Sequence, residues 1–204
     1  MDPYEPKKGT TTVGIVCEDG VILAADKRAT AGGLIANKEV EKIQEIQSHL
    51  GMTIAGLVSD AQALTRIMRV QTALYETQRN KKISVEGATT LLANIMHSRY
   101  FPYWVQLVMG GYDTKPRLYS LGGDGSSLEE KYVSTGSGSP VAYGVLEDRY
   151  KEGMTIKEAL PLAARAIKNA MERDSYSGNG IDLVTITKKG YDKLSQKEVE
   201  ALLK

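Results

Sequence analysis

Segments with strand character and segments with helix character form separate blocks along this 204-residue chain. Expected strands, rich in β-branched and apolar residues, span residues 10–17, 21–25, 34–35, 41–46, 52–58, 105–112, 117–121, 131–135 and 181–187. Helical periodicity fills two segments after the strand at 52–58, two more after residue 135, and a short one near the end. Because strands and helices do not alternate one for one, the pattern predicts an α+β fold with antiparallel sheets and stacked helices, not a doubly wound parallel sheet.

A serine or threonine precedes each expected helix. Such a side chain can accept a hydrogen bond from the free N–H groups of the first helical turn. We therefore expect N-caps at Ser59, Ser84, Ser139, Thr155 and Ser195. Those at Ser59, Thr155 and Ser195 are read as capping boxes, and Pro140 fits the first turn after Ser139.

The composition excludes several classes of protein. With 42% hydrophobic and 25% charged residues, the chain predicts one folded domain and not a disordered segment. The net charge of +1 lacks the excess of basic residues that is typical of a nucleic-acid-binding protein. The single cysteine, Cys17, excludes an internal disulfide framework. No apolar stretch approaches the length of a membrane span or of a signal-peptide core, so we expect a cytoplasmic protein with no membrane partner.

The first nine residues differ from the rest of the chain. They are polar, contain two prolines and end in Gly9, so we expect residues 1–9 to be a removable leader and residues 10–204 a single domain. Cleavage after Gly9 would make Thr10 the N-terminal residue. Its α-amino group, with an ordinary pKa of about 7.7–8.0, would then stand beside its own hydroxyl as a base. The alternative is that Thr10 merely begins a strand.

Two further residues favour the nucleophile interpretation. Asp26 ends an apolar strand, and a hairpin turning at Glu18–Gly20 would place it opposite Thr11 or Val13. Lys42 lies on an expected strand, where a neighbouring carboxylate could hold it and where its charge could lower the pKa of a hydroxyl. The alternatives are a solvated turn carboxylate and an ordinary surface lysine.

Other candidate sites have simpler interpretations. The chain has no phosphate-binding loop, zinc-protease, Cys-x-x-Cys or Gly-x-Ser-x-Gly motif. His49, His97 and Cys17 are interpreted as structural. The segment 122–125 reads as a turn between strands. The segment 136–139 precedes a helix, where it either starts that helix or presents N–H groups to an anion or a catalytic group.

Several longer motifs have the order and spacing of one family. They are GTTTVGIV at 9–16, VILAADKRAT at 21–30, EKI at 41–43, AGLVSDA at 55–61, TGSGSPVAYGVLE at 135–147 and RDSYSGNGIDL at 173–183. Over almost all of residues 10–187 the chain resembles the proteasome β subunits, which are N-terminal nucleophile hydrolases. The short leader is similar to that of archaeal members.

The resemblance implies a four-layer α/β/β/α sandwich and a threonine endopeptidase that needs no metal or organic cofactor. It implies a nucleophile at Thr10 with Asp26 and Lys42 as its partners, and an oxyanion-hole N–H at Gly56. The residues implied to organise the amine and its water are Ser137, Asp174 and Ser177. Those implied to bind the substrate are Ala29, Thr30, Val40, Ile54 and Val58. Autocatalytic processing between Gly9 and Thr10 is implied as well.

The resemblance also implies partners. Members of the family form a seven-membered β ring stacked on proteasome α subunits, and an ATP-driven unfoldase supplies unfolded polypeptides to the barrel. Two alternatives stay open: a non-catalytic structural subunit of the β ring, and the related bacterial peptidase with six-membered rings. The intact set Thr10, Asp26 and Lys42 disfavours the first. The Ala-Asp-Lys-Arg run at 25–28 disfavours the second.

Overall fold

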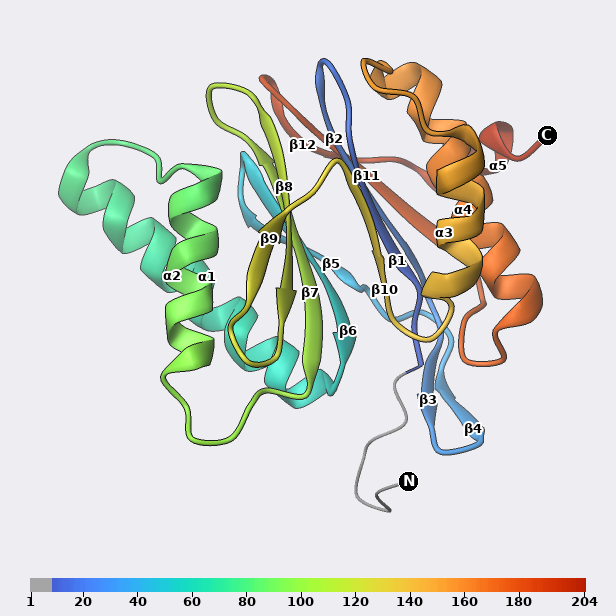
Figure 1. Cartoon of the computed structure of the whole chain (residues 1–204), viewed down its shortest axis with the longest axis horizontal. Coiled ribbons are helices and arrows are strands. Elements are labelled where there is room, and N and C mark those ends of the chain that lie inside the picture. Colours follow the sequence, from blue (N-terminus) through green and yellow to red (C-terminus); the bar gives the residue numbers. More distant parts are fainter. Residues whose placement is uncertain (1–8) are drawn as a thin grey trace.

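Two antiparallel sheets pack face to face between two layers of helices (Figure 1), in a computed structural model that describes residues 9–204. The expected leader therefore lies outside the described residues, apart from Gly9. The first sheet has the order β10 (Tyr132–Thr135), β1 (Thr12–Val16), β2 (Gly20–Asp26), β11 (Ile181–Thr187) and β12 (Gly190–Lys193). The second has the order β5 (Ile43–Gln47), β6 (Leu50–Gly56), β7 (Val105–Tyr112), β8 (Pro116–Gly122) and β9 (Ser127–Glu129). A separate hairpin consists of β3 (Ala29–Ala31) and β4 (Leu34–Asn37).

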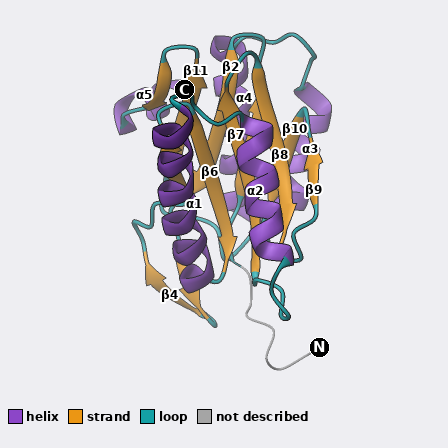
Figure 2. Ribbon diagram, turned by 90° about the vertical axis from the view of Figure 1, so that its left-hand side faces the viewer, coloured by secondary structure: helices purple, strands orange, loops and turns teal. Residues whose placement is uncertain are grey.

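Helices cover the outer face of each sheet. The pair α1 (Val58–Arg79) and α2 (Val85–His97) lies side by side on the second sheet (Figure 2). The first sheet is covered by α3 (Ser139–Arg149), α4 (Ile156–Arg173) and α5 (Gln196–Leu202). This arrangement confirms the predicted α+β class and the four-layer order that the resemblance implied. Within residues 9–204, none of the helices combines the length and the apolar character that a membrane crossing needs.

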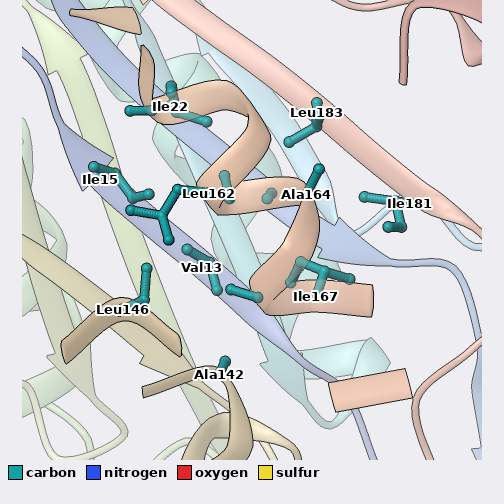
Figure 3. Close-up of a cluster of buried hydrophobic side chains, with 14 of the residues drawn as sticks. Val13, Ile15, Ile22, Ala142, Leu146, Leu162, Ala164, Ile167, Ile181 and Leu183 are labelled. Atoms are coloured by element: carbon teal, nitrogen blue, oxygen red, sulfur yellow. The ribbon is translucent and has the colours of Figure 1, made fainter. Parts of the chain in front are cut away.

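Three apolar clusters fill the spaces between the layers. One joins the first sheet to its helices, with Ile15, Leu146 and Ile167 among its members (Figure 3). A second joins the other sheet to α1 and α2, and a third lies between the two sheets. Strand β2 contributes to two of them, because alternate residues point to opposite faces. Its uninterrupted apolar run is thus explained by burial on both sides.

The structure corrects two of the expected helix starts. Helix α1 begins at Val58, inside what was expected to be a strand, and its N-cap is Leu57, which makes no side-chain cap bond. The predicted capping box at Ser59 is therefore wrong. Ser139 is the first residue of α3, and Gly138 is its N-cap. The caps at Ser84, Thr155 and Ser195 are confirmed, each accepting the hydrogen bond expected of it.

The β1–β2 hairpin fixes the position of the candidate active site. Thr12 pairs with Ala25, so Thr11 lies opposite Asp26, and the Asp26 N–H donates to the Thr11 carbonyl at 3.2 Å. Of the two registers left open by the sequence, the structure has the one with Asp26 opposite Thr11. This brings the end of β2 next to the start of β1, where Thr10 lies.

Candidate active site

Thr10 lies just before β1 and is nearly buried, with 5% of its surface exposed. Its hydroxyl donates a hydrogen bond to the carbonyl of Gly9. Its backbone N–H donates to Ser137 Oγ at 3.2 Å. The hydroxyl therefore already lies against the carbonyl of the peptide bond that leader removal would break.

Asp26 is fully buried and accepts four hydrogen bonds. The donors are Thr11 N (2.9 Å) and Lys42 Nζ (2.7 Å) on Oδ1, and Gly178 N (2.9 Å) and Arg28 N (3.0 Å) on Oδ2. A carboxylate without solvent needs such partners, because unpaired burial of a charge is very costly. The carboxylate thereby joins the residue after Thr10 to Lys42 and to the loop before β11.

Lys42 is the second buried charge of the site, with 3% of its surface exposed. It immediately precedes β5 and points its ammonium group at Asp26. Burial lowers the pKa of Lys42 below its usual value, although the Asp26 carboxylate acts in the opposite direction. Lys42 therefore releases a proton more readily than an exposed lysine does.

A second polar network supports Thr10 from the other side. Asp174, the C-cap of α4, accepts hydrogen bonds through Oδ2 from Ser137 Oγ and Ser177 Oγ, each at 2.6 Å. The Ser177 hydroxyl also lies 2.7 Å from Thr11 Oγ1. Ser137 comes from the loop before α3, and Asp174 and Ser177 come from the loop between α4 and β11. Through Ser137 the network reaches the Thr10 nitrogen.

The segment before α3 passes directly over Thr10. A Cβ on Gly136, which has a φ of +92°, would lie 2.1 Å from the Thr10 carbonyl oxygen, and one on Gly138 would lie 2.0 Å from Thr11 Oγ1. Only glycine permits this approach. Residues 136–139 start helix α3, which was one of the two interpretations, and they also contact Thr10. The Gly138 N–H donates to the Thr10 carbonyl at 3.4 Å, and the Ser137 hydroxyl, which the sequence pattern did not suggest, accepts from the Thr10 N–H.

Gly56 ends β6 with a φ of +113°. Because Leu57 N donates to Trp104 O at 2.8 Å, the neighbouring pair Gly56–Val105 is a non-hydrogen-bonded pair of the ladder. The Gly56 N–H then points away from β7. It points to the same side as the Ile54 N–H, which donates to the Lys42 carbonyl at 2.9 Å. The Gly56 N–H thus faces the part of the site that contains Lys42.

Several of these residues line one pocket. Its lining contains Gly9, Thr10, Lys42, Gly56 and all five residues expected to bind substrate, namely Ala29, Thr30, Val40, Ile54 and Val58. Ala55, Ala61 and Arg28 complete it. The sequence reasoning missed Arg28 as a lining residue, although it stands in the Asp-Lys-Arg run at 26–28. Its guanidinium donates to Asn179 Oδ1 at 2.8 Å and to the Ser175 carbonyl at 2.7 Å, so it supports the loop that carries Ser177.

Gly9 fits tightly at the edge of this pocket. A Cβ at this position would lie 2.6 Å from Tyr176 Cβ and 2.7 Å from Thr30 Oγ1. The residue before Thr10 therefore has no room for a side chain without movement of its neighbours.

The surroundings of His49 and Cys17 agree with the structural roles expected of them. His49 is buried with Nε2 2.8 Å from the Ile83 carbonyl oxygen. Burial raises the pKa of the Cys17 thiol to about 12, which keeps it in its unreactive protonated form. Residues 122–125 form the expected turn, between β8 and β9. Across residues 9–204, no three His, Cys, Asp or Glu side chains gather in a way that could hold a metal ion.

Comparison with known proteins identifies the family. The family model described as "Proteasome subunit" matches residues 6–186. The chain belongs to the proteasome subunit family. It is 54% identical over 206 residues to "Proteasome subunit beta" of Methanohalophilus mahii, an alignment that covers 100% of this chain and 98% of the relative. The protein of the same name from Methanothermobacter thermautotrophicus is 52% identical over 203 residues, covering 98% and 97% of the two chains.

A third relative, "Proteasome subunit beta 2" of Aeropyrum pernix, is 51% identical over 193 residues, or 94% of this chain and 88% of the relative. These matches confirm the resemblance to archaeal proteasome β subunits. The first two alignments extend over nearly the whole of both chains and so span the segments that line the Thr10 pocket.

Proposed function

We propose that this chain is a catalytic β subunit of the proteasome core, a threonine endopeptidase whose nucleophile is Thr10. The observation that carries the proposal is the pocket itself. Thr10 lines it together with Lys42 and Gly56, and the Asp26 carboxylate holds both Lys42 and the Thr11 N–H. A hydroxyl nucleophile, a lysine with a lowered pKa and a free backbone N–H are the parts that acyl transfer requires.

The first acyl transfer releases the leader. Thr10 Oγ1 attacks the Gly9 carbonyl carbon and passes its proton to Lys42, while the Gly56 N–H stabilises the developing oxyanion. The bond between Gly9 and the Thr10 nitrogen then breaks, and that nitrogen takes up a proton to become a free amine. Water hydrolyses the resulting ester, so the leader leaves with a new carboxylate and Thr10 regains its hydroxyl.

Peptide hydrolysis repeats these steps on a substrate. Thr10 Oγ1 forms an ester with the acyl half of the substrate and the amine half leaves with a proton. Water activated by the Thr10 amine then hydrolyses the ester. Ser137, which accepts from the Thr10 N–H and donates to Asp174, would orient that amine. No metal or organic cofactor takes part in these steps.

The proposal extends to the assembly. We place the chain in a seven-membered β ring against proteasome α subunits, in the cytoplasm, with an ATP-driven unfoldase feeding unfolded polypeptides to the barrel. The names of the relatives support a place among the β subunits of a proteasome. A structural subunit without activity is disfavoured by the complete set of site residues, and counting subunits per ring by electron microscopy distinguishes the seven-membered from the six-membered particle.

The primary test is the N-terminal residue of active particles. We expect Edman sequencing of assembled, peptidase-active particles to read Thr-Thr-Thr-Val, because residues 1–9 are removed at the Gly9–Thr10 bond. The same preparation should hydrolyse a fluorogenic peptide. Active particles that retain Met1 would refute the assignment of Thr10, and correctly processed particles without peptidase activity would support the structural subunit.

The pocket predicts a preference for apolar residues on the acyl side of the cut. Ala29, Val40, Ile54 and Val58 offer no charge, and the two cations in the lining already have partners. A buried Leu or Phe side chain gains about 1.5–3 kcal/mol there, whereas an unpaired charge would be desolvated.

We expect Ile54→Glu to move the preference towards Lys and Arg, measured with peptides that differ only at the residue on the acyl side of the cut. Ile54→Leu is the matched control and should keep the parent order. Faster cleavage after Arg or Glu than after Leu by the parent would contradict this pocket assignment.

A further inference from the structure

Asp60 connects helix α1 to the segment that precedes β7. It lies in the first turn of α1, and its Oδ2 accepts a hydrogen bond from the Trp104 N–H at 3.0 Å. Trp104 is one residue before the start of β7. The sequence pattern suggested that Asp60 belongs to a capping box, but the helix has no side-chain cap. The carboxylate is used instead to hold a backbone group 44 residues further along the chain.

The backbone of Trp104 is fixed at both of its polar groups. Its N–H is held by Asp60, and its carbonyl accepts from the Leu57 N–H at 2.8 Å. The same carbonyl packs against Gly56, where a Cβ would lie only 2.2 Å from it. The peptide that links Gly56 to Leu57 is therefore in contact with a backbone segment whose position depends on the Asp60 carboxylate.

The direction of the Gly56 N–H is set by the pairing of Ala55 with Gln106 in the β6–β7 ladder, and the contact with Trp104 holds the next peptide at the end of that ladder. The bond from Leu57 N to Trp104 O is the last connection between the two segments, and it makes Gly56–Val105 a non-hydrogen-bonded pair. Were the Trp104 segment free to shift, this end of the ladder would move with it, and the Gly56 N–H would be held less firmly in its direction towards the pocket. A donor in an oxyanion hole contributes most when it is held in place before the reaction.

We propose that Asp60 is a positioning residue for the oxyanion hole, which holds the Gly56 N–H in its catalytic direction through the Trp104 backbone. The proposal rests on the proposed function, since it presumes that Gly56 supplies the oxyanion-hole donor. This role differs from a purely structural one in anchoring α1. It requires that replacing Asp60 weakens stabilisation of the transition state and leaves substrate binding unchanged.

The test uses assembled, processed particles of the parent, Asp60→Ala, Asp60→Asn and Asp60→Glu. For Asp60→Ala we expect kcat for a fluorogenic peptide to fall about 10- to 100-fold with little change in KM, because a misplaced group in the site costs rate rather than ground-state binding. Asn keeps an acceptor oxygen at the same position and should restore most of kcat. Glu moves the carboxylate by one methylene group and should give an intermediate loss.

Inhibitor binding supplies a readout that a structural role would not change. Thr10 Oγ1 adds to the carbon of a peptide aldehyde, and the hydroxyl proton passes to the former carbonyl oxygen, which occupies the oxyanion position. The corresponding peptide alcohol cannot form this bond. We expect Asp60→Ala to weaken aldehyde binding by about the same factor as kcat and to leave alcohol binding unchanged. Equal weakening of both inhibitors would overturn the proposal.

Asp113→Ala is the matched control. The Asp113 carboxylate also joins a first helical turn to a distant loop, accepting from Val85 N at 2.9 Å, but it does not line the Thr10 pocket. We expect it to lower thermal stability and leave kcat and aldehyde affinity at the parent values. A kcat of Asp60→Ala equal to that of the parent would overturn the proposal. If the alanine variant fails to assemble, a kcat of Asp60→Glu equal to that of the parent would overturn it instead. If the parent itself neither hydrolyses peptide nor binds the aldehyde, it is the proposed function that fails.

Discussion

Replacing Thr10 with alanine is expected to abolish both leader removal and peptide hydrolysis, lowering the rate by about 10⁴-fold or more, as loss of a covalent nucleophile does in other enzymes. The change removes the hydroxyl that donates to the Gly9 carbonyl. It removes no bond between the sheets, so the chain should still fold and assemble. The measurements are the intact mass of the assembled subunit and its turnover of a fluorogenic peptide.

Thr10→Ser and Thr114→Ala complete this experiment. Serine keeps both the hydroxyl and, after processing, the amine, so substantial activity should remain. Thr114 is an exposed threonine in the turn after β7, and its replacement should leave processing and turnover unchanged. Parent-like turnover by purified Thr10→Ala particles would refute the nucleophile assignment, whatever their N-terminal residue.

Much of this fold is predictable from local patterns because many of its paired strands are neighbours in the chain. The apolar run at 21–25 is a strand buried on both faces, and the turn at Glu18–Gly20 is enough to bring Asp26 next to Thr11. The strands 105–112 and 181–187 have the predicted ends. Short edge strands such as β9 and β12 were not predicted, because their residues are largely exposed and lack a clear apolar alternation.

Long-range contacts explain what the local patterns missed. Ser59 and Gln62 have the spacing of a capping box, yet the bond between Asp60 and Trp104 gives the first turn of α1 another role. The direction of the Gly56 N–H depends on the pairing of β6 with β7. Ser137 meets Asp174 and Ser177 only because two loops far apart in the sequence converge on Thr10. The residues themselves gave no reason to group them, and only the family resemblance did.

Replacing Lys42 is expected to have the second large effect on turnover. In Lys42→Ala the buried Asp26 carboxylate loses the one ion pair that it forms within residues 9–204, at a cost of up to about 3–5 kcal/mol for a broken buried pair, although three backbone N–H donors remain. Turnover should fall by orders of magnitude, because the variant lacks the ammonium group to which the Thr10 hydroxyl proton is proposed to pass. Lys131→Ala is the matched control. Lys131 forms an exposed pair with Glu152 at 2.8 Å, and such a pair contributes little to stability.

Lys42→Arg distinguishes the effect of the positive charge from the effect of proton transfer. The arginine keeps a positive charge that can pair with Asp26, so the folding defect should be smaller than that of Lys42→Ala. A guanidinium is planar, however, where the pocket holds a compact ammonium, and it does not lose its proton in a protein. The lowered pKa of Lys42, which burial produces, has no counterpart in arginine. We therefore expect assembled Lys42→Arg particles to be stable and yet nearly inactive. Turnover equal to that of the parent would show that charge alone suffices, and the proton-transfer role assigned to Lys42 would be wrong.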